Sequence, residues 1–183
     1  MKKFYIVANP DKENTKNMQA AIEKYLKAHG AGVSLGKSVS GHGNPYTDPE
    51  EVPADTECVI TLGGDGTILH LAKLAALNRI PMLGINMGGL GFIAELETSE
   101  LETLRRLKDW NFTTEQRMML DVAVFREGKQ VYTNLGLNDA VIREGPISHV
   151  IHLKVFSDGK HLADIAGDGA IIATPTGSTA YSL

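Results

Sequence analysis

The chain has a single cysteine, no long apolar run and no marked excess of one charge. Cys58 cannot form an internal disulfide, and its place in an apolar run predicts a small core residue rather than a nucleophile. The formal net charge of -4 excludes a global field that would attract nucleic acid or an anionic membrane. No segment approaches membrane-spanning length. These absences predict a soluble, cytoplasmic protein with neither a nucleic-acid nor a membrane partner.

The first half of the chain alternates between short apolar runs and amphipathic segments. Strands are predicted at residues 3–8, 33–39, 58–62 and 81–85. Helices are predicted from about residue 15 to the stop at Gly30, from 67 to about 78, and after a capping box formed by Ser99 and Glu102. Because strands alternate with helices, this half is expected to form a parallel sheet covered by helices on both faces.

After Trp110 the pattern changes to strand-like runs without long helical segments between them. The turn signals "REGK" and "SDGK" link neighbouring runs as hairpins. We therefore predict an α/β amino-terminal domain over residues 1–112 and an all-β, sandwich-like domain over residues 113–183. The chain stops at the start of a helical pattern, so we expect it to be truncated and its second domain to be incomplete at the carboxyl end.

The stretch "GGDGT" places Asp65 among glycines where a buried strand should end. Glycine allows positive φ and close approach of a ligand to the backbone, and the helix that follows presents amide groups suited to phosphate. Gly64, Gly66 and Thr67 are therefore candidate phosphate-binding residues. A carboxylate beside phosphates requires a cation or a hydroxyl partner. Asp65 is predicted to orient or deprotonate an alcohol during phosphoryl transfer while Mg²⁺ shields the charge; the alternative is that Asp65 only caps the helix.

Three further motifs suit a nucleotide. "GLGFIA" at residues 89–94 formally matches the dinucleotide fingerprint, but no continuous helical pattern follows, so a loop held close to other atoms is favoured. Asp168 lies between glycines ahead of "AIIATPTGSTAY", whose hydroxyls and Tyr181 suit phosphate, ribose or a base; a hairpin turn is the alternative. Asn138 and Asp139 interrupt a strand pattern and suit ribose hydroxyls or an exocyclic amine; a strand-end turn is the alternative.

The six histidines show no metal-ligand spacing, so no side chain is predicted as a metal ligand. His70 differs from the others because it lies one turn after Thr67, at the start of the helix behind the glycine loop. There it could face bound phosphate, and a partly buried helix residue is the alternative.

In their order and content, "GGDGT", "NMGGLGFIAEL", "LND" and "GDG…TPTGSTAYS" resemble the successive signatures of the ATP-dependent NAD kinase family. "GGDGT" is shared with diacylglycerol and sphingosine kinases, whereas the "LGF" and "TPTGSTAYS" elements are typical of NAD kinases. The resemblance spans almost the whole chain. It implies an α/β domain followed by a β-sandwich-like domain, with NAD bound between them. It also implies that the γ-phosphoryl group of ATP is transferred to the 2′-hydroxyl of the adenosine ribose of NAD, giving NADP.

By position, the resemblance implies that Asp65 is the proton acceptor and Gly66 its contacting neighbour. It implies that Asn138 and Asp139 contact NAD and that His70 lies near the nucleotide. Further residues implied to line the dinucleotide site are Asp168, Thr179, Ala180 and Tyr181. Since members of the family are commonly dimers or tetramers, the resemblance also implies a homo-oligomer, with Mg²⁺ or another divalent cation accompanying ATP. Related enzymes continue well beyond "TAYS".

Two other functions stay open on the sequence alone. One is a kinase with a lipid or sugar acceptor, of the diacylglycerol or sphingosine type. The acidic balance and the absence of a basic amphipathic helix argue against a membrane substrate. The other is a non-catalytic nucleotide-binding fragment, which the half-formed end of the chain suggests.

Overall fold

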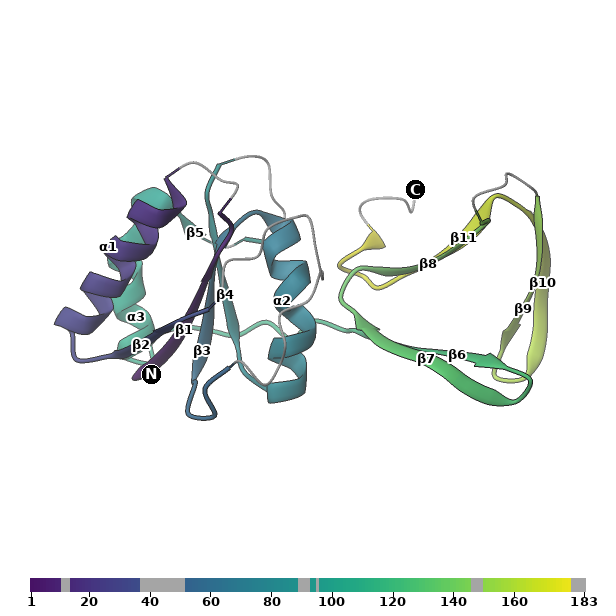
Figure 1. The fold of residues 1–183 in the computed structure, drawn as a ribbon, viewed down its shortest axis with the longest axis horizontal. Coiled ribbons are helices and arrows are strands. Elements are labelled where there is room, and N and C mark those ends of the chain that lie inside the picture. The colour runs from purple at the N-terminus through teal and green to yellow at the C-terminus, as the bar shows by residue number, and fades with distance from the viewer. Residues whose placement is uncertain (11–13, 37–51, 89–92, 95, 146–149, 179–183) are drawn as a thin grey trace. The chain divides into compact units, whose positions relative to one another are not determined.

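The computed structural model describes residues 1–10, 14–36, 52–88, 93–94, 96–145 and 150–178. The chain divides into two compact units, Met1–Gln116 and Arg117–Leu183 (Figure 1). In the described ranges, no helix is long and apolar enough to cross a membrane. The predicted domain boundary between residues 112 and 113 stays a prediction.

The first unit contains a five-stranded sheet in the order β2-β1-β3-β4-β5, and every pair of neighbours in it is parallel. The strands are β1 (Lys3–Ala8), β2 (Gly32–Leu35), β3 (Cys58–Gly63), β4 (Met82–Asn86) and β5 (Leu96–Glu97). The prediction of a parallel α/β sheet is therefore confirmed. Because the strands run in one direction, their carboxyl ends share one edge of the sheet. Of the strand predicted at residues 33–39, residues 37–39 lie outside the described part.

Among the described residues, four helical segments accompany this sheet. They are α1 (Thr15–Ala28), α2 (Asp65–Asn78), the 3-10 helix η2 (Thr98–Leu104) and α3 (Arg105–Lys108). Gly30, at φ 78°, follows α1 and supplies the predicted stop. The helix α2 begins two residues before the predicted start at Thr67.

The single helix predicted after Ser99 is wrong, because a 3-10 helix and a short α-helix stand in its place. Glu100 departs from helical geometry, with φ -103° and ψ 21°. Apolar residues at 101, 104 and 107 are spaced by three. A 3-10 helix aligns side chains at this spacing as well as an α-helix does, so the pattern could not separate the two.

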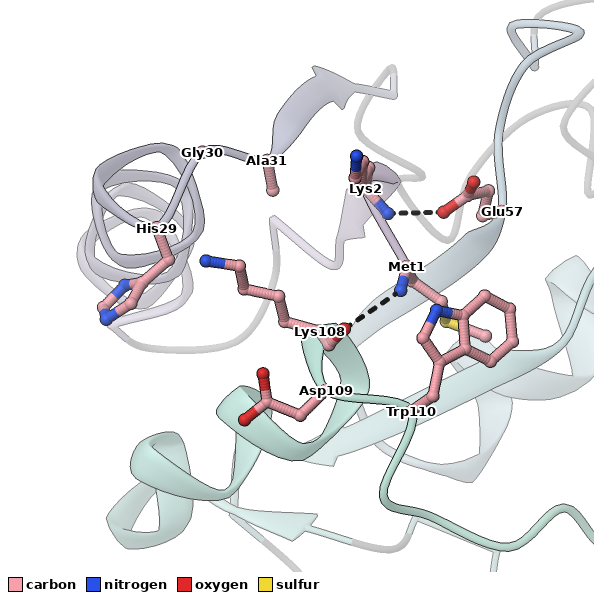
Figure 2. Close-up of a pocket in the computed structure, with 9 residues that line it drawn as sticks. All are labelled: Met1, Lys2, His29, Gly30, Ala31, Glu57, Lys108, Asp109 and Trp110. Carbon is pink, nitrogen blue, oxygen red and sulfur yellow. Dashed lines mark hydrogen bonds between the residues drawn. The ribbon is translucent and has the colours of Figure 1, made fainter.

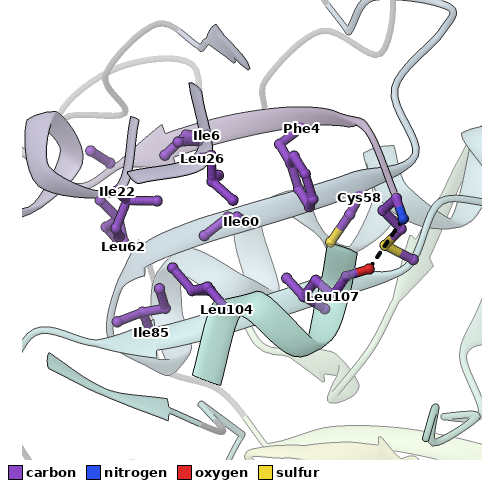
Figure 3. Packing of buried hydrophobic residues seen from close by; sticks show 12 residues of the cluster. Phe4, Ile6, Ile22, Leu26, Cys58, Ile60, Leu62, Ile85, Leu104 and Leu107 are labelled. Carbon is purple, nitrogen blue, oxygen red and sulfur yellow. Dashed lines mark hydrogen bonds between the residues drawn. The ribbon is translucent and has the colours of Figure 1, made fainter. Parts of the chain in front are cut away.

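The sheet carries a separate apolar layer on each face, because successive side chains of a strand point to opposite sides. On one face the strands pack against α1, η2 and α3 (Figure 3). The residues of this layer include Phe4, Ile6, Ile22, Leu26, Cys58, Ile60, Leu62, Ile85, Leu104 and Leu107. On the other face the strands pack against α2, through Tyr5, Val7, Val59, Leu71 and Leu74. These two layers fix where the strand ends and the loops after them lie.

The prediction that Cys58 is a core residue is confirmed. Its side chain is 2% exposed and belongs to the layer that packs against α1 and η2. Burial raises the pKa of the Cys58 thiol to about 12, so the thiol is protonated at neutral pH.

The second unit consists of antiparallel strands, as predicted, arranged in three two-stranded ribbons. The ribbons pair β6 (Leu120–Arg126) with β7 (Lys129–Gly136), β8 (Asp139–Arg143) with β11 (Gly169–Ala173), and β9 (Ile151–Ser157) with β10 (Lys160–Gly167). Two of them close through predicted turns. Glu127 and Gly128 have φ of 51° and 75°, and Asp158 and Gly159 have φ of 50° and 74°. Positive φ at both central residues is the condition for a tight hairpin turn, so both hairpin predictions are confirmed.

Candidate functional site

Asp65 stands at the carboxyl edge of the sheet, where β3 passes into α2. Gly64 occupies the N-cap position with an extended backbone, and no side chain caps α2. Asp65 is the first residue of the helix, and its Oδ1 accepts a hydrogen bond of 3.1 Å from the backbone N–H of Ile93. The helix-cap alternative is therefore wrong, because the cap position is taken by Gly64. The carboxylate instead joins two loops that are 28 residues apart in the chain.

The glycines around Asp65 differ in whether packing within the protein requires them. None of Gly63, Gly64 and Gly66 has positive φ, so the expectation of a left-handed backbone is wrong here. A Cβ on Gly63 would lie 2.1 Å from Oγ1 of Thr67, so glycine is needed for the loop to close on the helix. A Cβ on Gly64 or Gly66 would meet none of the described atoms within 4 Å. Packing within the protein does not require glycine at these two positions, and the bare backbone suits a ligand that approaches closely.

The loop that follows β4 lies beside the glycine loop. The N–H of Met87 donates to the carbonyl of Gly63 at 2.9 Å, and a Cβ on Gly84 would lie 3.1 Å from Cα of Ala94. The hydrogen bonds from Met87 to Gly63 and from Ile93 to Asp65 attach the two described ends of "NMGGLGFIA" to "GGDGT". Residues 89–92 lie outside the described part. Beyond the motif the chain forms β5 and not a helix, which removes the dinucleotide-fingerprint interpretation.

Thr67 and His70 lie on the first turns of α2. Thr67 is buried, and its N–H donates to the carbonyl of Gly64 at 2.9 Å. His70 is half-buried, and burial lowers the pKa of its imidazole below the usual value of 6.5. A neutral imidazole adds no positive charge for a phosphate, although it can still hydrogen-bond. His70 thus fits the partly buried alternative, and its contact with phosphate stays a prediction.

In the second unit, Asn138 and Asp139 lie where the chain turns from β7 into β8. Both residues are half-buried. The Oδ1 atom of Asn138 is buried, and within the described residues it has no hydrogen-bond partner. A buried acceptor without a donor is costly unless a further group supplies one. This atom is therefore a candidate contact for a ligand N–H or O–H group.

Asp168 connects β10 to β11. These two strands belong to different ribbons, so the hairpin-turn alternative for Asp168 is wrong. Its side chain is exposed, and its carbonyl accepts a hydrogen bond of 3.1 Å from the N–H of Glu144. The carboxylate is thus presented on the surface of the second unit.

The loop after β11 is only partly described, and the predicted site residues Thr179, Ala180 and Tyr181 lie outside the described residues. Two hydroxyls of this loop that were predicted to contact a ligand, those of Thr176 and Ser178, are engaged by the protein. The hydroxyl of Ser178 donates to the carbonyl of Pro175 at 2.9 Å, and Oγ1 of Thr176 accepts from Arg117 at 3.4 Å. Both hydroxyls were predicted as donors to phosphate or ribose, and that role stays a prediction.

Thr174 is a residue that reasoning from the sequence missed. It is 1% exposed, and its hydroxyl donates to the carbonyl of Leu137 at 2.5 Å. The same oxygen accepts from the N–H of Gly177 at 3.2 Å. The sequence shows a threonine between an apolar run and a loop, which is too common to signal such a bond.

A cavity of about 490 Å³ lies in the first unit, at the amino ends of the strands, whereas Asp65 follows the carboxyl end of β3. Figure 2 shows the residues that line the cavity. Its lining comes from the segments before the strands and from the ends of α1 and α3. It comprises Met1, Lys2, His29, Gly30, Ala31, Glu57, Lys108, Asp109 and Trp110. The backbone N–H of Lys2 donates to the Glu57 carboxylate, and the terminal amine of Met1 donates to the carbonyl of Leu107 at 3.1 Å. The cavity contains none of the predicted site residues.

Metal binding by side chains alone finds no support in the described ranges. No group of three or more His, Cys, Asp and Glu residues there could hold a metal ion.

Comparison with known proteins relates both units to one family. The profile of the ATP-NAD kinase N-terminal domain matches residues 4–108, and that of the ATP-NAD kinase C-terminal domain matches residues 137–183. The chain is 40% identical over 186 residues to a protein named NAD kinase from Lachnoclostridium phytofermentans. It is 36% identical over 187 residues to one from Acetivibrio thermocellus. Each alignment covers 100% of this chain and 65% of the relative, so the chain spans about two thirds of their length.

A solved structure shows a similar fold. The yeast NADH kinase, crystallised as a complex with NADH, aligns with a TM-score of 0.82 and 25% sequence identity. The alignment covers 100% of this chain and 60% of the yeast chain.

Proposed function

Since the chain belongs to the ATP-NAD kinase family, we propose that it carries the catalytic loop and part of the dinucleotide site of an NAD kinase. The proposed reaction transfers the γ-phosphoryl group of ATP to the 2′-hydroxyl of the adenosine ribose of NAD, and its products are NADP and ADP. The proposal concerns the protein expressed from its complete reading frame, because the chain spans about 65% of the length of its relatives.

The observation that carries this proposal is the setting of Asp65. Its carboxylate accepts a hydrogen bond from the N–H of Ile93, and a Cβ at the neighbouring Gly64 or Gly66 would meet no described atom within 4 Å. A ribose hydroxyl is a poor nucleophile at neutral pH, and phosphoryl transfer depends mostly on position and charge. The backbone of Asp65 is fixed in the first turn of α2, and its Oδ1 is fixed by the hydrogen bond from Ile93. A carboxylate held in this way can orient the ribose hydroxyl without being a strong base.

In the proposed step, the ribose 2′-oxygen forms a bond to the γ-phosphorus while the bond from that phosphorus to the β–γ bridging oxygen breaks. The proton of the hydroxyl passes to Asp65, and ADP carries away the electrons of the broken bond. The amide groups at the start of α2, next to Gly64 and Gly66, are proposed to hold phosphate oxygens.

The second unit is proposed to supply contacts to NAD. The buried Oδ1 of Asn138, which lacks a donor among the described residues, suits the exocyclic amine of adenine or a ribose hydroxyl. Asp139 begins β8 directly after it, and Asp168 presents an exposed carboxylate. We assign the remaining dinucleotide contacts to residues 179–181 on their resemblance to the family's motif.

Mg²⁺ is proposed to enter with ATP. Magnesium in such enzymes is held largely by substrate phosphates with one or two carboxylates. When bound, it neutralises charge on the phosphates. The cytoplasmic location and the dimeric or tetrameric assembly are likewise proposals, the second testable by light scattering of the purified protein.

Asp65→Asn tests the mechanism. Asn keeps an oxygen that can accept from Ile93 but loses the negative charge, so kcat for NADP formation should fall about 100-fold or more with little change in KM. The matched control is Asp121→Asn, which makes the same change at an exposed position on β6 and should leave the rate unaltered. Full activity in the Asp65 variant would reject the role given to this carboxylate.

The same assay separates the other functions. NAD binding without turnover by the wild-type protein would favour the non-catalytic alternative. Phosphorylation of diacylglycerol in vesicles, without any NAD turnover, would favour a lipid kinase.

A further inference from the structure

The second unit brings two nucleotide motifs together through one side chain. Thr174 follows β11 and lies beside the turn between β7 and β8. Its hydroxyl donates to the carbonyl of Leu137 at 2.5 Å, and its backbone N–H donates to the carbonyl of Asn138 at 2.7 Å. The "LND" turn is therefore attached to Thr174 at two successive peptide groups.

Thr174 also shapes its own loop. Its hydroxyl oxygen accepts from the N–H of Gly177 at 3.2 Å, and its carbonyl accepts from the N–H of Ser178 at 2.9 Å. The hydroxyl is thus both donor and acceptor, which valine cannot reproduce although its shape is nearly the same. At 1% exposure, no water replaces these bonds in the wild-type protein.

Gly177 also brings the loop after β11 into direct contact with Asn138. A Cβ at this position would lie 2.2 Å from the carbonyl oxygen of Asn138 and 2.7 Å from its Cα. The backbone at Gly177 therefore rests directly on the peptide of Asn138, and any larger residue must push the two loops apart. This is an independent sign that the two motifs are built to touch.

We propose that Thr174 is a positioning residue that fixes the peptides of Leu137 and Asn138 against residues 175–178, so that Asn138 and Asp139 are held in the arrangement that binds NAD. The proposal rests on the proposed function, because the motifs concerned are the proposed NAD contacts. Thr174 acts through its neighbours, since its own hydroxyl is already used by Leu137 and Gly177. Its loss should therefore affect NAD and spare ATP.

The test is Thr174→Val in the protein expressed from its complete reading frame. The KM for NAD and the Kd for NAD measured by calorimetry should each rise about tenfold or more, while the KM for ATP stays within about twofold. Thr174→Ser keeps the hydroxyl and should restore NAD binding to within about threefold of wild type. Thr133→Val, on the exposed part of β7, is the matched control and should change nothing.

Gly177→Ala is the second variant and keeps the proposal testable should Thr174→Val fail to fold. It leaves the hydroxyl in place but crowds Asn138, so the Kd for NAD should rise by a similar factor with ATP unaffected. Unchanged NAD affinity in a folded Thr174→Val or Gly177→Ala protein overturns the proposal, as does an equal loss of NAD and ATP affinity. A wild-type protein that does not bind NAD refutes the proposed function instead, and that result is read before any variant is made.

Discussion

The two units contain similar apolar residues, but these side chains are buried in the first unit and partly exposed in the second. In the first unit, Ile60 and Val59 on neighbouring positions of β3 are both 0% exposed, because helices cover both faces of the sheet. In the second unit, Ile172 is 47% exposed and Val141 is 55% exposed. Burial of such side chains is the main favourable term in folding. The first unit therefore contains its own core, and the described part of the second does not.

The ribbon of β8 and β11 shows the difference most clearly. Val141 lies opposite Ile171 in the antiparallel register, and Ala140 lies opposite Ile172 on the other face. Apolar residues on both faces of a ribbon are typical of strands that are covered on both sides. The turn residues and the pairing define these strands, but the packing that would stabilise them is absent from the described ranges. Asp65 thus belongs to a unit that is stabilised by its own core. Asn138 belongs to a unit whose stability depends on further contacts.

The largest expected difference between the two units is in their stability as separate fragments. A fragment of residues 1–116 should fold cooperatively, with a free energy of unfolding of about 5 kcal/mol or more. A fragment of residues 117–183 should show no cooperative transition. In the described part of this fragment, Leu137 is the one hydrophobic residue that is buried. Urea unfolding followed by circular dichroism measures both. A sharp transition in the second fragment would break the comparison.

The same substitution in the two units gives the next largest effect. Ile60→Ala removes a fully buried side chain and should destabilise the first unit by about 2–5 kcal/mol. Ile172→Ala truncates a side chain that is 47% exposed, so the first unit should not change. Cys58, 2% exposed, reports on the first unit alone. Its labelling by a thiol reagent in native buffer should accelerate about 30-fold or more in the first variant and stay constant in the second.

The elements of the fold that the sequence predicted well are those with a local physical signal. The turns "REGK" and "SDGK" demand positive φ at Glu127 and Asp158 as well as at the glycines, and the structure shows it. The apolar run at residues 3–8 is a strand with the predicted bounds. The helix predicted after Ser99 failed because a spacing of three fits a 3-10 helix as well as an α-helix.

The candidate site was harder to predict because its geometry is non-local. "GGDGT" identified Asp65 as a carboxylate at a strand end, but only the fold brings Ile93 to its Oδ1. Positive φ was the wrong reason for the glycines, since Gly63 is needed for contact with Thr67. Thr174 gave no signal at all, because its partners Leu137 and Asn138 lie 37 and 36 positions away and no periodicity relates them.

The smallest expected effect is a pH dependence confined to the first unit. Burial holds the pKa of His70 in the folded chain below its usual 6.5. Above that value the imidazole is neutral in both states, and stability does not depend on it. As the pH falls below 6.5, the unfolded chain takes up a proton that the folded chain resists, so the first unit loses stability until the pH passes the folded pKa. The urea midpoint of Cys58 exposure should therefore decrease slightly between about pH 7 and about pH 5.5, a window above the titration of ordinary carboxyl groups. His70→Gln should flatten this decrease in the urea midpoint. If the urea midpoint of the His70 variant decreases with pH as steeply as that of the wild type, another group is responsible for the decrease.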